Sequence, residues 1–463
     1  MPLVVGIDLG TQSLKVVACD AELRVVGAHA IAYPTQRPAA DRAEQDPHAW
    51  EAALVAAVAG AVGDRGGEVV ALAIAGQLDG CVAVDAHGAP RGPARIWQDR
   101  SAPLAALDPA RVFAITGQVA DPSHLAPKAA RAPGAARYHA PVSYLVARLT
   151  GEAVLDPALA STTMLLELAT QRWSAELLAA HGLVATQLPR IAPTCSVAGA
   201  LRTALAGIPA GTPVAVGTGD DFATPLGAGL VAPGRLVCAI GTAEVVGAFA
   251  ATPVRDTARE PMVETHVAPA GGYFVENPGW MSGGVVRWAA DLLGVTDAEL
   301  DALAADVGSD GVTFIPALAG LMAPVWRPAA RGTLHGLGAA HDRRHVARAV
   351  LEGLAFACRD VAERLGALGL AATEAIVLGG GGRSAVWTQL RADALGLPHR
   401  VAARTDTCAI GAAMIAAVAA GIVPDLVAAA ALAEPPGAPV LPRASLDAPY
   451  ARYRALIAQL GYG

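Results

Sequence analysis

The sequence predicts an α/β protein built from two halves that share one order of elements. In the first half, three apolar strands, a helix and a further strand follow one another, at residues 3–7, 14–19, 25–28, 46–64 and 69–75. This order differs from the simple alternation of strand and helix in a doubly wound fold. A second series of strands, each running into a glycine turn, begins near Gly211. No strict sequence repeat links the halves, so any duplication would be ancient or only structural.

Local signals support the elements of the first half. The first three strands are joined by tight turns and form a meander, with Asp20 in the second turn. Asp46 followed by Pro47 is typical of a helix start, with an N-cap and a proline at the first helical position. Residues 81–85 are expected to form another strand, which ends before the turn His87-Gly88.

The remaining elements are expected from the same kinds of signal. Residues 100–200 read as short, mainly helical pieces that prolines interrupt. Strands are expected at 214–217, 236–240, 245–250, 375–378 and 399–402, and helices at 283–294, 343–367, 408–421 and 447–460.

Composition excludes several classes of protein. Of the 463 residues 54% are apolar and 16% charged, so the chain can bury large cores and is not disordered. The net charge of -7 gives no basic face, and we expect no nucleic-acid partner. The six cysteines form no C-x-x-C pair, which excludes a zinc ribbon and a thioredoxin motif.

Nothing in the sequence predicts a membrane partner. No basic stretch precedes the first apolar run, as a secretory signal would require. The uncharged segment 409–424 is shorter than a membrane span and reads as a buried helix. We therefore expect a cytoplasmic protein with reduced thiols.

The stretch Gly6-Ile-Asp8-Leu-Gly10-Thr11-Gln12-Ser13 is the first that could carry chemistry. An acid at a strand end beside a glycine turn can hold Mg²⁺, while backbone N–H groups line phosphate oxygens. A simple hairpin turn explains the same residues equally well.

The stretch Gly217-Thr-Gly219-Asp220-Asp221 is the second. If the acids lie on a strand, their side chains point in opposite directions, and one can face a cleft as a general base. Taken alone, a solvated turn is the more ordinary explanation.

Ile240-Gly241-Thr242 is a further strand that runs into a turn with a hydroxyl group, and Gly379–Gly382 is a run of four glycines between a strand and a helix. Such glycines allow the backbone to approach a nucleotide closely. The run also matches the dinucleotide-binding pattern G-x-G-x-x-A at Gly380, Gly382 and Ala385, and Asp406 lies at the distance expected of a ribose-binding acid. An NAD-dependent oxidoreductase is therefore an alternative function. No P-loop motif occurs, which excludes P-loop kinases.

Taken together and in order, the motifs resemble the FGGY family of carbohydrate kinases, and within it the xylulokinase-like branch. The likeness runs from residue 3 to about 422. The motifs that carry it are Gly6–Lys15, Glu44–Trp50, Ala75–Gly80, Trp97–Arg100, Pro127-Lys128, Gly219–Ala223, Gly241-Thr242, Phe314–Leu337 and Gly379–Asp393.

This resemblance implies two ribonuclease-H-like domains of the actin-like ATPase and sugar kinase fold around a central cleft. The N-terminal domain, 1–230, would supply the sugar and phosphate side with the catalytic base, and the C-terminal domain, 231–463, the nucleotide side. The implied activity is ATP- and Mg²⁺-dependent phosphorylation of a primary hydroxyl of a small sugar, with a pentulose such as D-xylulose as the first expectation. A polyol kinase for erythritol, glycerol or a pentitol is the alternative. The expected partner is the sugar alone, and a homodimer is left open.

The roles implied by the resemblance fall on named positions. Asp220 is the expected catalytic base, and Asp8 with Asp220 the expected Mg²⁺ ligands. The expected ATP contacts are Thr11, Gln12, Ser13, Lys15, Gly241, Thr242, Gly380, Gly381 and Ser384. The expected sugar contacts are Gln77, Leu78, Asp79, Trp97 and Asp221.

Two positions depart from the xylulokinase pattern. Gln77-Leu78-Asp79-Gly80 stands where Q-M-H-G is usual, and Asp221 follows the expected base where asparagine is common. Both changes add negative charge near the sugar. Asp79 would then bond either to sugar hydroxyls or to Arg100, and His124 is expected to be a packing or surface histidine.

Overall fold

The chain is divided into two compact units in the computed structural model, which describes residues 1–462. Unit 1 comprises Met1–Val231, His266–Gly272 and Asp406–Ala433, and unit 2 comprises Ala232–Thr265, Tyr273–Thr405 and Glu434–Gly463. Both units are assembled from separate stretches of the chain, whereas the domains expected from the sequence are continuous.

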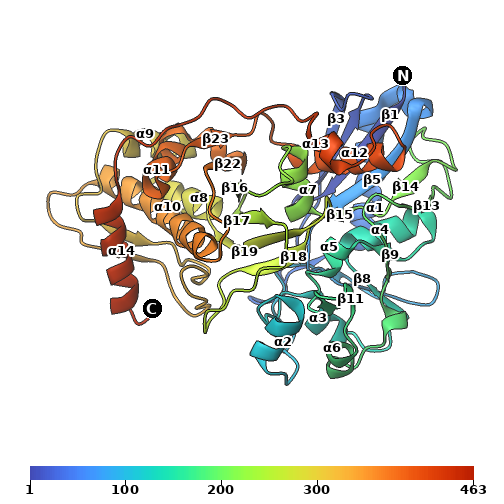
Figure 1. Ribbon diagram of the computed structural model, residues 1–463, viewed down its shortest axis with the longest axis horizontal. Coiled ribbons are helices and arrows are strands. Elements are labelled where there is room, and N and C mark those ends of the chain that lie inside the picture. The colour runs from blue at the N-terminus through green and yellow to red at the C-terminus, as the bar shows by residue number, and fades with distance from the viewer. Residues whose placement is uncertain (463) are drawn as a thin grey trace. The chain divides into compact units, whose positions relative to one another are not determined.

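The central sheet of unit 1 has the strand order β13-β14-β5-β1-β2-β3, and β15 also pairs with β5 (Figure 1). β1 runs antiparallel to β2 and parallel to β5, and β2 runs antiparallel to β3. The predicted meander is therefore present. The strands of this sheet are β1 Leu3–Leu9, β2 Ser13–Cys19, β3 Val25–Ala32, β5 Val69–Gly76, β13 Val197–Ala200, β14 Pro213–Ala215 and β15 Thr218–Gly219.

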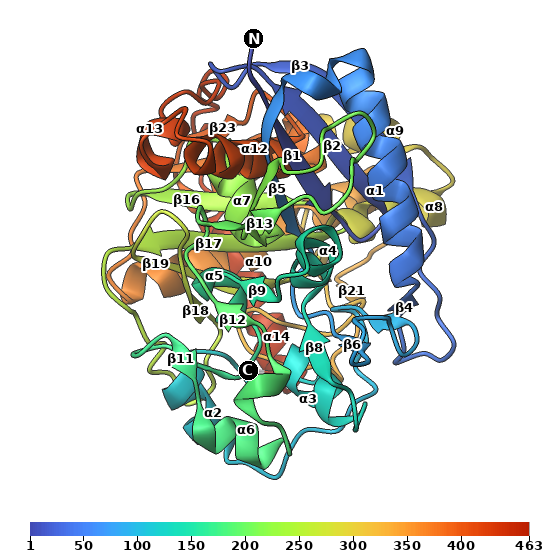
Figure 2. The same ribbon diagram turned by 90° about the vertical axis from the view of Figure 1, so that its right-hand side faces the viewer.

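Two helices, α1 (Pro47–Val62) and α12 (Thr407–Ala419), lie on opposite sides of this sheet (Figure 2). Asp46 caps α1 by accepting a hydrogen bond from the His48 N–H at 2.9 Å, as the sequence predicts. On the other side, a side chain at Gly6 would lie 2.0 Å from the Ala409 carbonyl oxygen, so only glycine allows α12 to approach β1 this closely.

The apolar character of α12 explains why a late stretch of chain belongs to unit 1. Its residues are buried from Thr407 to Ala417, as in a helix that is apolar on all sides. The expected buried helix in the segment 409–424 is thus confirmed. Among residues 1–462, no helix is long and apolar enough to cross a membrane.

The rest of unit 1 consists of short elements, as the sequence predicts for residues 100–200. The helices are α2 Pro109–Thr116, α3 Leu125–Ala130, α4 Pro141–Thr150, α5 Pro157–Ala160, α6 Ala175–Ala180, α7 Asp220–Gly227 and α13 Leu426–Ala430. The short strands are β4 Glu44–Gln45, β6 Val82–Val84, β7 Ala94–Arg95, β8 Arg137–His139, β9 Val154–Leu155, β10 Leu166–Glu167, β11 Arg172–Trp173 and β12 Arg190–Ile191.

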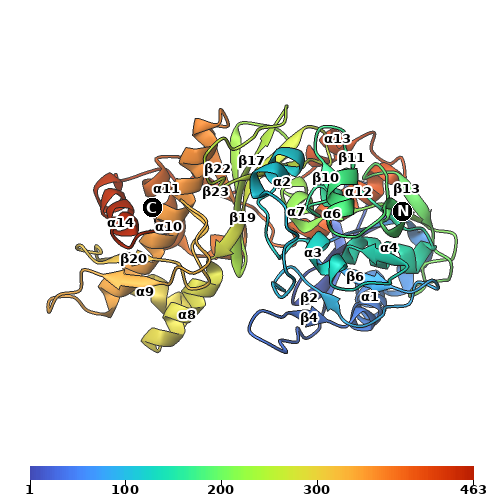
Figure 3. The same ribbon diagram turned by 90° about the horizontal axis from the view of Figure 1, so that it is seen from below.

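The sheet of unit 2 repeats the main pairing of unit 1. Its order is β18-β19-β17-β16-β22-β23, with β16 antiparallel to β17 and parallel to β22. Helices α10 and α11 lie side by side and cover part of it (Figure 3). The elements are β16 Arg235–Ile240, β17 Ala243–Ala250, β18 Glu264–Val267, β19 Tyr273–Met281, β20 Thr313–Ile315, β21 Thr333–His335, β22 Glu374–Gly379, β23 His399–Val401, α8 Gly283–Leu293, α9 Asp297–Ala305, α10 Arg343–Ala367, α11 Ala385–Leu395 and α14 Asp447–Gln459.

The sequence misses one central strand of unit 2. β19 contains Pro278 and Gly279, which normally indicate a turn. The pairing of β17 with β19 shifts register between Glu244 and Val246, opposite these two residues, and this irregularity accommodates the proline.

Candidate active site

Three parallel strands of unit 1 end at one place. Leu9 of β1 pairs with Gly76 of β5, and Gly76 pairs with Gly219 of β15. Because the carboxyl ends of parallel strands share one edge of a sheet, the residues near these ends, Asp8, Gln77 and Asp220, are brought to the same edge. Ligand sites in open α/β sheets commonly lie at this edge.

Gly219 makes a close approach possible at this edge. A side chain there would lie 2.1 Å from Cδ2 of Leu78. Leu78 is therefore seated against the turn that carries Asp220, and any larger residue at position 219 would displace it.

Asp8 is buried at the end of β1, opposite Lys15 of β2. The Lys15 Nζ lies 3.8 Å from the Asp8 Oδ2, and the lysine side chain is half exposed. Burial raises the pKa of Asp8, while Lys15 and a hydrogen bond with Cys408 partly oppose the rise. Cys408, expected to be a small core residue, thus contacts the candidate site.

Asp220 and Asp221 occupy a helix, which corrects the sequence prediction. They are the first two residues of α7, whose N-cap is Gly219, so their side chains do not alternate across a strand. Burial raises the pKa of Asp220 well above its usual value, and the carboxylates of Asp221 and Asp8 raise it further. Burial, with the charge of Asp79, raises the pKa of Asp221 to about 7.

The turn of Thr11, Gln12 and Ser13 is held from several sides. The Gly10 N–H donates to the Ser13 carbonyl at 3.1 Å, and the Tyr33 hydroxyl donates to the Gly10 carbonyl. The Gln45 amide donates to the Thr11 carbonyl at 2.6 Å. Sequence reasoning missed Tyr33 as a support, although Gln45 lies in one of the family motifs.

Two expected sugar contacts also support this turn. The Trp97 indole N–H donates to the Thr11 hydroxyl at 2.9 Å, so its polar atom is used within the protein. Gln77 is buried, and its amide donates to the Gln45 Oε1 at 3.0 Å. Within residues 1–462 its own Oε1 has no hydrogen-bond partner.

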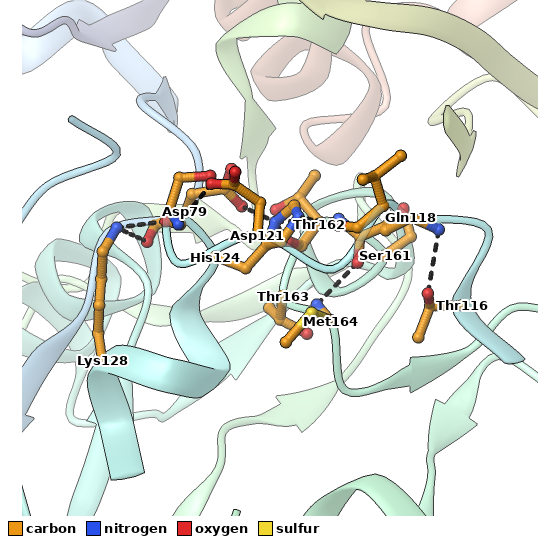
Figure 4. Close-up of polar contacts among 12 residues, drawn as sticks. Asp79, Thr116, Gln118, Asp121, His124, Lys128, Ser161, Thr162, Thr163 and Met164 are labelled. Carbon is orange, nitrogen blue, oxygen red and sulfur yellow. Dashed lines mark hydrogen bonds and ion pairs between the residues drawn. The ribbon is translucent and has the colours of Figure 1, made fainter. Parts of the chain in front are cut away.

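Asp79 contacts His124, and Arg100, one of the two alternative partners considered for it, pairs elsewhere (Figure 4). The Asp79 Oδ1 lies 3.3 Å from the His124 Nδ1. Arg100 instead pairs with Asp121, at 3.0 Å between Nη1 and Oδ2. His124 is buried, and because it is 45 residues from Asp79 in the chain, no local signal could have revealed the contact.

Lys128 is a buried support of the same region. Its Nζ donates to the carbonyls of Asp79 at 2.9 Å, of Ile96 at 2.7 Å, and of Ser123. Burial lowers the pKa of Lys128 to about 8. Three carbonyl acceptors satisfy the three donors of an ammonium group, which explains a lysine rather than an arginine here.

The expected ATP contacts outside the Thr11 turn and Lys15 lie in unit 2. Gly241 and Thr242 form an exposed turn between β16 and β17. In the glycine run, side chains at Gly379, Gly381 and Gly382 would meet neighbouring atoms at 2.6 Å or less, whereas nothing lies within 4 Å of one at Gly380. Open space is therefore found at Gly380, while Gly381 is needed for close packing.

Ser384 has structural bonds of its own. Its Oγ accepts from the Trp387 N–H at 2.9 Å as the N-cap of α11, and it donates to Asp301 of α9. The structure thus gathers the expected base, metal and sugar residues in unit 1. Gly241, Thr242, Gly380, Gly381 and Ser384 belong to unit 2.

Comparison with known proteins assigns the chain to a family. Residues 3–227 match the N-terminal domain, and residues 236–420 the C-terminal domain, of the FGGY family of carbohydrate kinases. The chain is 33% identical over 441 residues to the xylulose kinase of Escherichia coli K12, covering 90% of both chains. It is 32% identical over 458 residues to a glycerol kinase of Myxococcus xanthus, covering 90% of this chain and 91% of the relative.

A solved structure supports the same family assignment. A xyloylose (xylulose) kinase from Brucella ovis superimposes with a TM-score of 0.92 at 30% identity, covering 99% of both chains. The chain therefore belongs to the FGGY family of carbohydrate kinases. It is a phosphotransferase with an alcohol group as acceptor, and it has the two-domain α/β fold of sugar kinases.

Proposed function

We propose that the chain transfers the terminal phosphoryl group of ATP to a primary hydroxyl of a small neutral sugar, with a pentulose such as D-xylulose as the first candidate. The observation that carries the proposal is the meeting of Asp8 and Asp220 at the ends of β1 and β15, beside the Thr11 turn. Phosphoryl transfer needs positioning and charge neutralisation more than covalent help, and these residues offer both.

Asp220 is the proposed general base. Its carboxylate accepts the proton of the attacking hydroxyl as that oxygen bonds to the terminal phosphorus and ADP leaves. Its raised pKa, caused by burial and by Asp221 and Asp8, makes it a stronger base than a solvated aspartate.

Asp8 and Asp220 fit the requirements of a magnesium site. Carboxylate oxygens are preferred ligands of Mg²⁺, and the cation beside Asp8 is a half-exposed Lys15 at 3.8 Å. When bound, Mg²⁺ neutralises charge on the transferred phosphate. We assign Lys15 to bracing Asp8 rather than to a direct phosphate contact.

For ATP we propose backbone and hydroxyl contacts from Thr11, Gln12 and Ser13 and from Gly241 and Thr242. Gly380 is the proposed place of close approach to the nucleotide, because a side chain there would meet nothing within 4 Å. Gly381 and Ser384 are assigned supporting roles instead.

For the sugar we propose contacts from Leu78, Asp79, Asp221 and the ring of Trp97. A polyol kinase is the second candidate, because Asp79 adds an acceptor for hydroxyl donors and because glycerol kinases are as similar to the chain as xylulose kinases. A homodimer remains a prediction.

A coupled assay of ADP release tests the proposal. The purified chain is given ATP and Mg²⁺ with a panel of ketopentoses, erythritol, glycerol and pentitols. We expect turnover with at least one ketopentose, D-xylulose first. Turnover with a polyol alone would replace the first candidate by the second, and no turnover with any member would contradict both.

A further inference from the structure

His124 is buried, and both of its ring nitrogens make polar contacts, which packing alone does not require. It stands at the N-cap of α3, and only 4% of its side chain is exposed. Its Nε2 lies 3.0 Å from the Val119 carbonyl oxygen, and its Nδ1 lies 3.0 Å from the Thr162 carbonyl oxygen and 3.3 Å from the Asp79 Oδ1 (Figure 4). Each ring nitrogen therefore lies close to at least one oxygen that can only accept a hydrogen bond.

The hydrogen-bond partners indicate the charge of this ring. A neutral imidazole has one N–H donor and one acceptor nitrogen, so it would turn a lone pair against one of these oxygens, whereas an imidazolium donates from both nitrogens. The side-chain amide of Gln118 places a donor near the ring. Its Oε1 accepts from the Met164 N–H at 2.7 Å, so its NH₂ group faces His124 and lies 3.3 Å from Nδ1. The Thr162 carbonyl is nearer to Nδ1 than the Gln118 amide is, and Nε2 faces the Val119 carbonyl, so these contacts favour an N–H on both ring nitrogens.

Asp79 is the acidic partner of His124 that a substrate can reach. Seventeen per cent of its side chain is exposed, against 4% for His124. Asp121, which also feels the charge of His124, is already paired with Arg100. The other histidine near Asp79, His266, stays neutral, because burial lowers its pKa to about 4.

The backbone of Asp79 is fixed as well. Its φ of +56° lies in the left-handed region, which aspartate tolerates better than most residues. Its carbonyl accepts from the buried Lys128 Nζ at 2.9 Å. The residue is thus held at its carbonyl by Lys128 and at its carboxylate by His124.

We propose that His124 is a positioning residue that acts through Asp79: a buried imidazolium that orients this carboxylate for the hydroxyl groups of the substrate. This inference rests on the proposed function. It makes Asp79 an acceptor for hydroxyl donors, so the pair selects neutral polyhydroxy substrates. Sugar acids such as D-gluconate are rejected, because their carboxylate would meet that of Asp79.

A double-mutant cycle separates positioning from structural support. The variants are His124→Gln, Asp79→Asn and the two together, assayed with the substrate that the wild type prefers. We expect His124→Gln to raise KM about tenfold or more with kcat within about threefold, and to change KM less than about twofold in the Asp79→Asn background. Equal losses in both backgrounds would overturn the proposal, because a structural role does not depend on Asp79.

His139→Gln is the matched control. His139 is buried in the same unit, its Nδ1 contacts the Ser143 Oγ at 2.9 Å, and burial lowers its pKa to about 3. This variant removes a buried neutral ring, and we expect its preference between a neutral substrate and D-gluconate to match that of the wild type. Preference of the wild type for D-gluconate would overturn the selection rule.

A measurement without turnover tests the charge pair itself. NMR of ¹⁵N-histidine-labelled protein, assigned with His124→Gln, reports whether each ring nitrogen carries a proton at pH 7.5. Two protons on His124 support the proposal, and one unprotonated ring nitrogen overturns it. If the pair is charged but no sugar is phosphorylated, the proposed function fails while the pair stands.

Discussion

Two turns of the chain share a Gly-Thr pair and the same place in their sheets, yet they carry different chemistry. Gly10-Thr11 joins β1 to β2 in unit 1, and Gly241-Thr242 joins β16 to β17 in unit 2. In each turn the glycine N–H donates to a carbonyl further on, at 3.1 Å to Ser13 and at 2.8 Å to Ala243.

The acids around the two turns differ. Two residues before the glycine, unit 1 has Asp8 and unit 2 has Ala239. Unit 2 has its acid after the turn instead, at Glu244, which is fully buried and pairs with Arg391. The two turns therefore share a backbone hydrogen bond but differ in their acids, because Glu244 is bound by Arg391, whereas Asp8 has a half-exposed Lys15 beside it at 3.8 Å.

The largest effect is expected when the proposed proton acceptor of unit 1, the Asp220 carboxylate, is removed. Asp220→Asn keeps the shape of the side chain but cannot accept the proton, and loss of a general base costs roughly 10²–10⁴ in rate. We expect kcat to fall within that range or further, measured by ADP release, while ATP still binds. Turnover above about a third of the wild-type value would exclude Asp220 as the base.

In unit 2 the acid is structural, so breaking its pair should cost stability. Arg391→Met leaves the Glu244 carboxylate buried without its cation, and such a loss destabilises by about 3–5 kcal/mol. Urea unfolding measures the change. The double variant Glu244→Gln with Arg391→Met should recover part of it, and equal instability of the single and double variants would argue against the ion pair as the cause.

A smaller effect is expected at the proposed metal ligand. Asp8→Ala should lower kcat at fixed Mg²⁺ by about 10- to 100-fold, and excess Mg²⁺ should restore part of the activity, because charge on the transferred phosphate still needs neutralising. Titrating Mg²⁺ at saturating ATP measures this. A Mg²⁺ dependence identical to that of the wild type would remove Asp8 from the metal site.

The last expected effect concerns the titration of Asp221. Its pKa is about 7, above the ordinary 3.8, so its contribution to stability is fully present below about pH 3.8 and is lost as the pH rises through 7. Asp221→Asn cannot ionise, so its stability relative to the wild type should increase by about 2–3 kcal/mol between pH 5 and pH 8.

Urea unfolding at both pH values checks this prediction. The same variant should change KM for the sugar more than kcat, in contrast to Asp220→Asn. A stability difference that is independent of pH would mean that Asp221 is already ionised at pH 5 in the folded protein.

The sequence by itself determined the elements whose signals are local. The meander β1 to β3, the start of α1 at Asp46-Pro47 and the bounds of α10 follow from apolar runs, caps and turns within a few residues. The motifs of acids and glycines could be recognised for the same reason, because the residues that form a turn are neighbours in the sequence.

Only the tertiary structure decided which side chains meet. Asp79 pairs with His124 rather than Arg100, and Cys408 contacts Asp8 from the far end of the chain. Asp220 and Asp221 begin a helix, although their sequence is equally compatible with a strand end. The reason is physical: propensities are local, whereas the partner of a buried charge is chosen by packing between segments that lie far apart in the sequence.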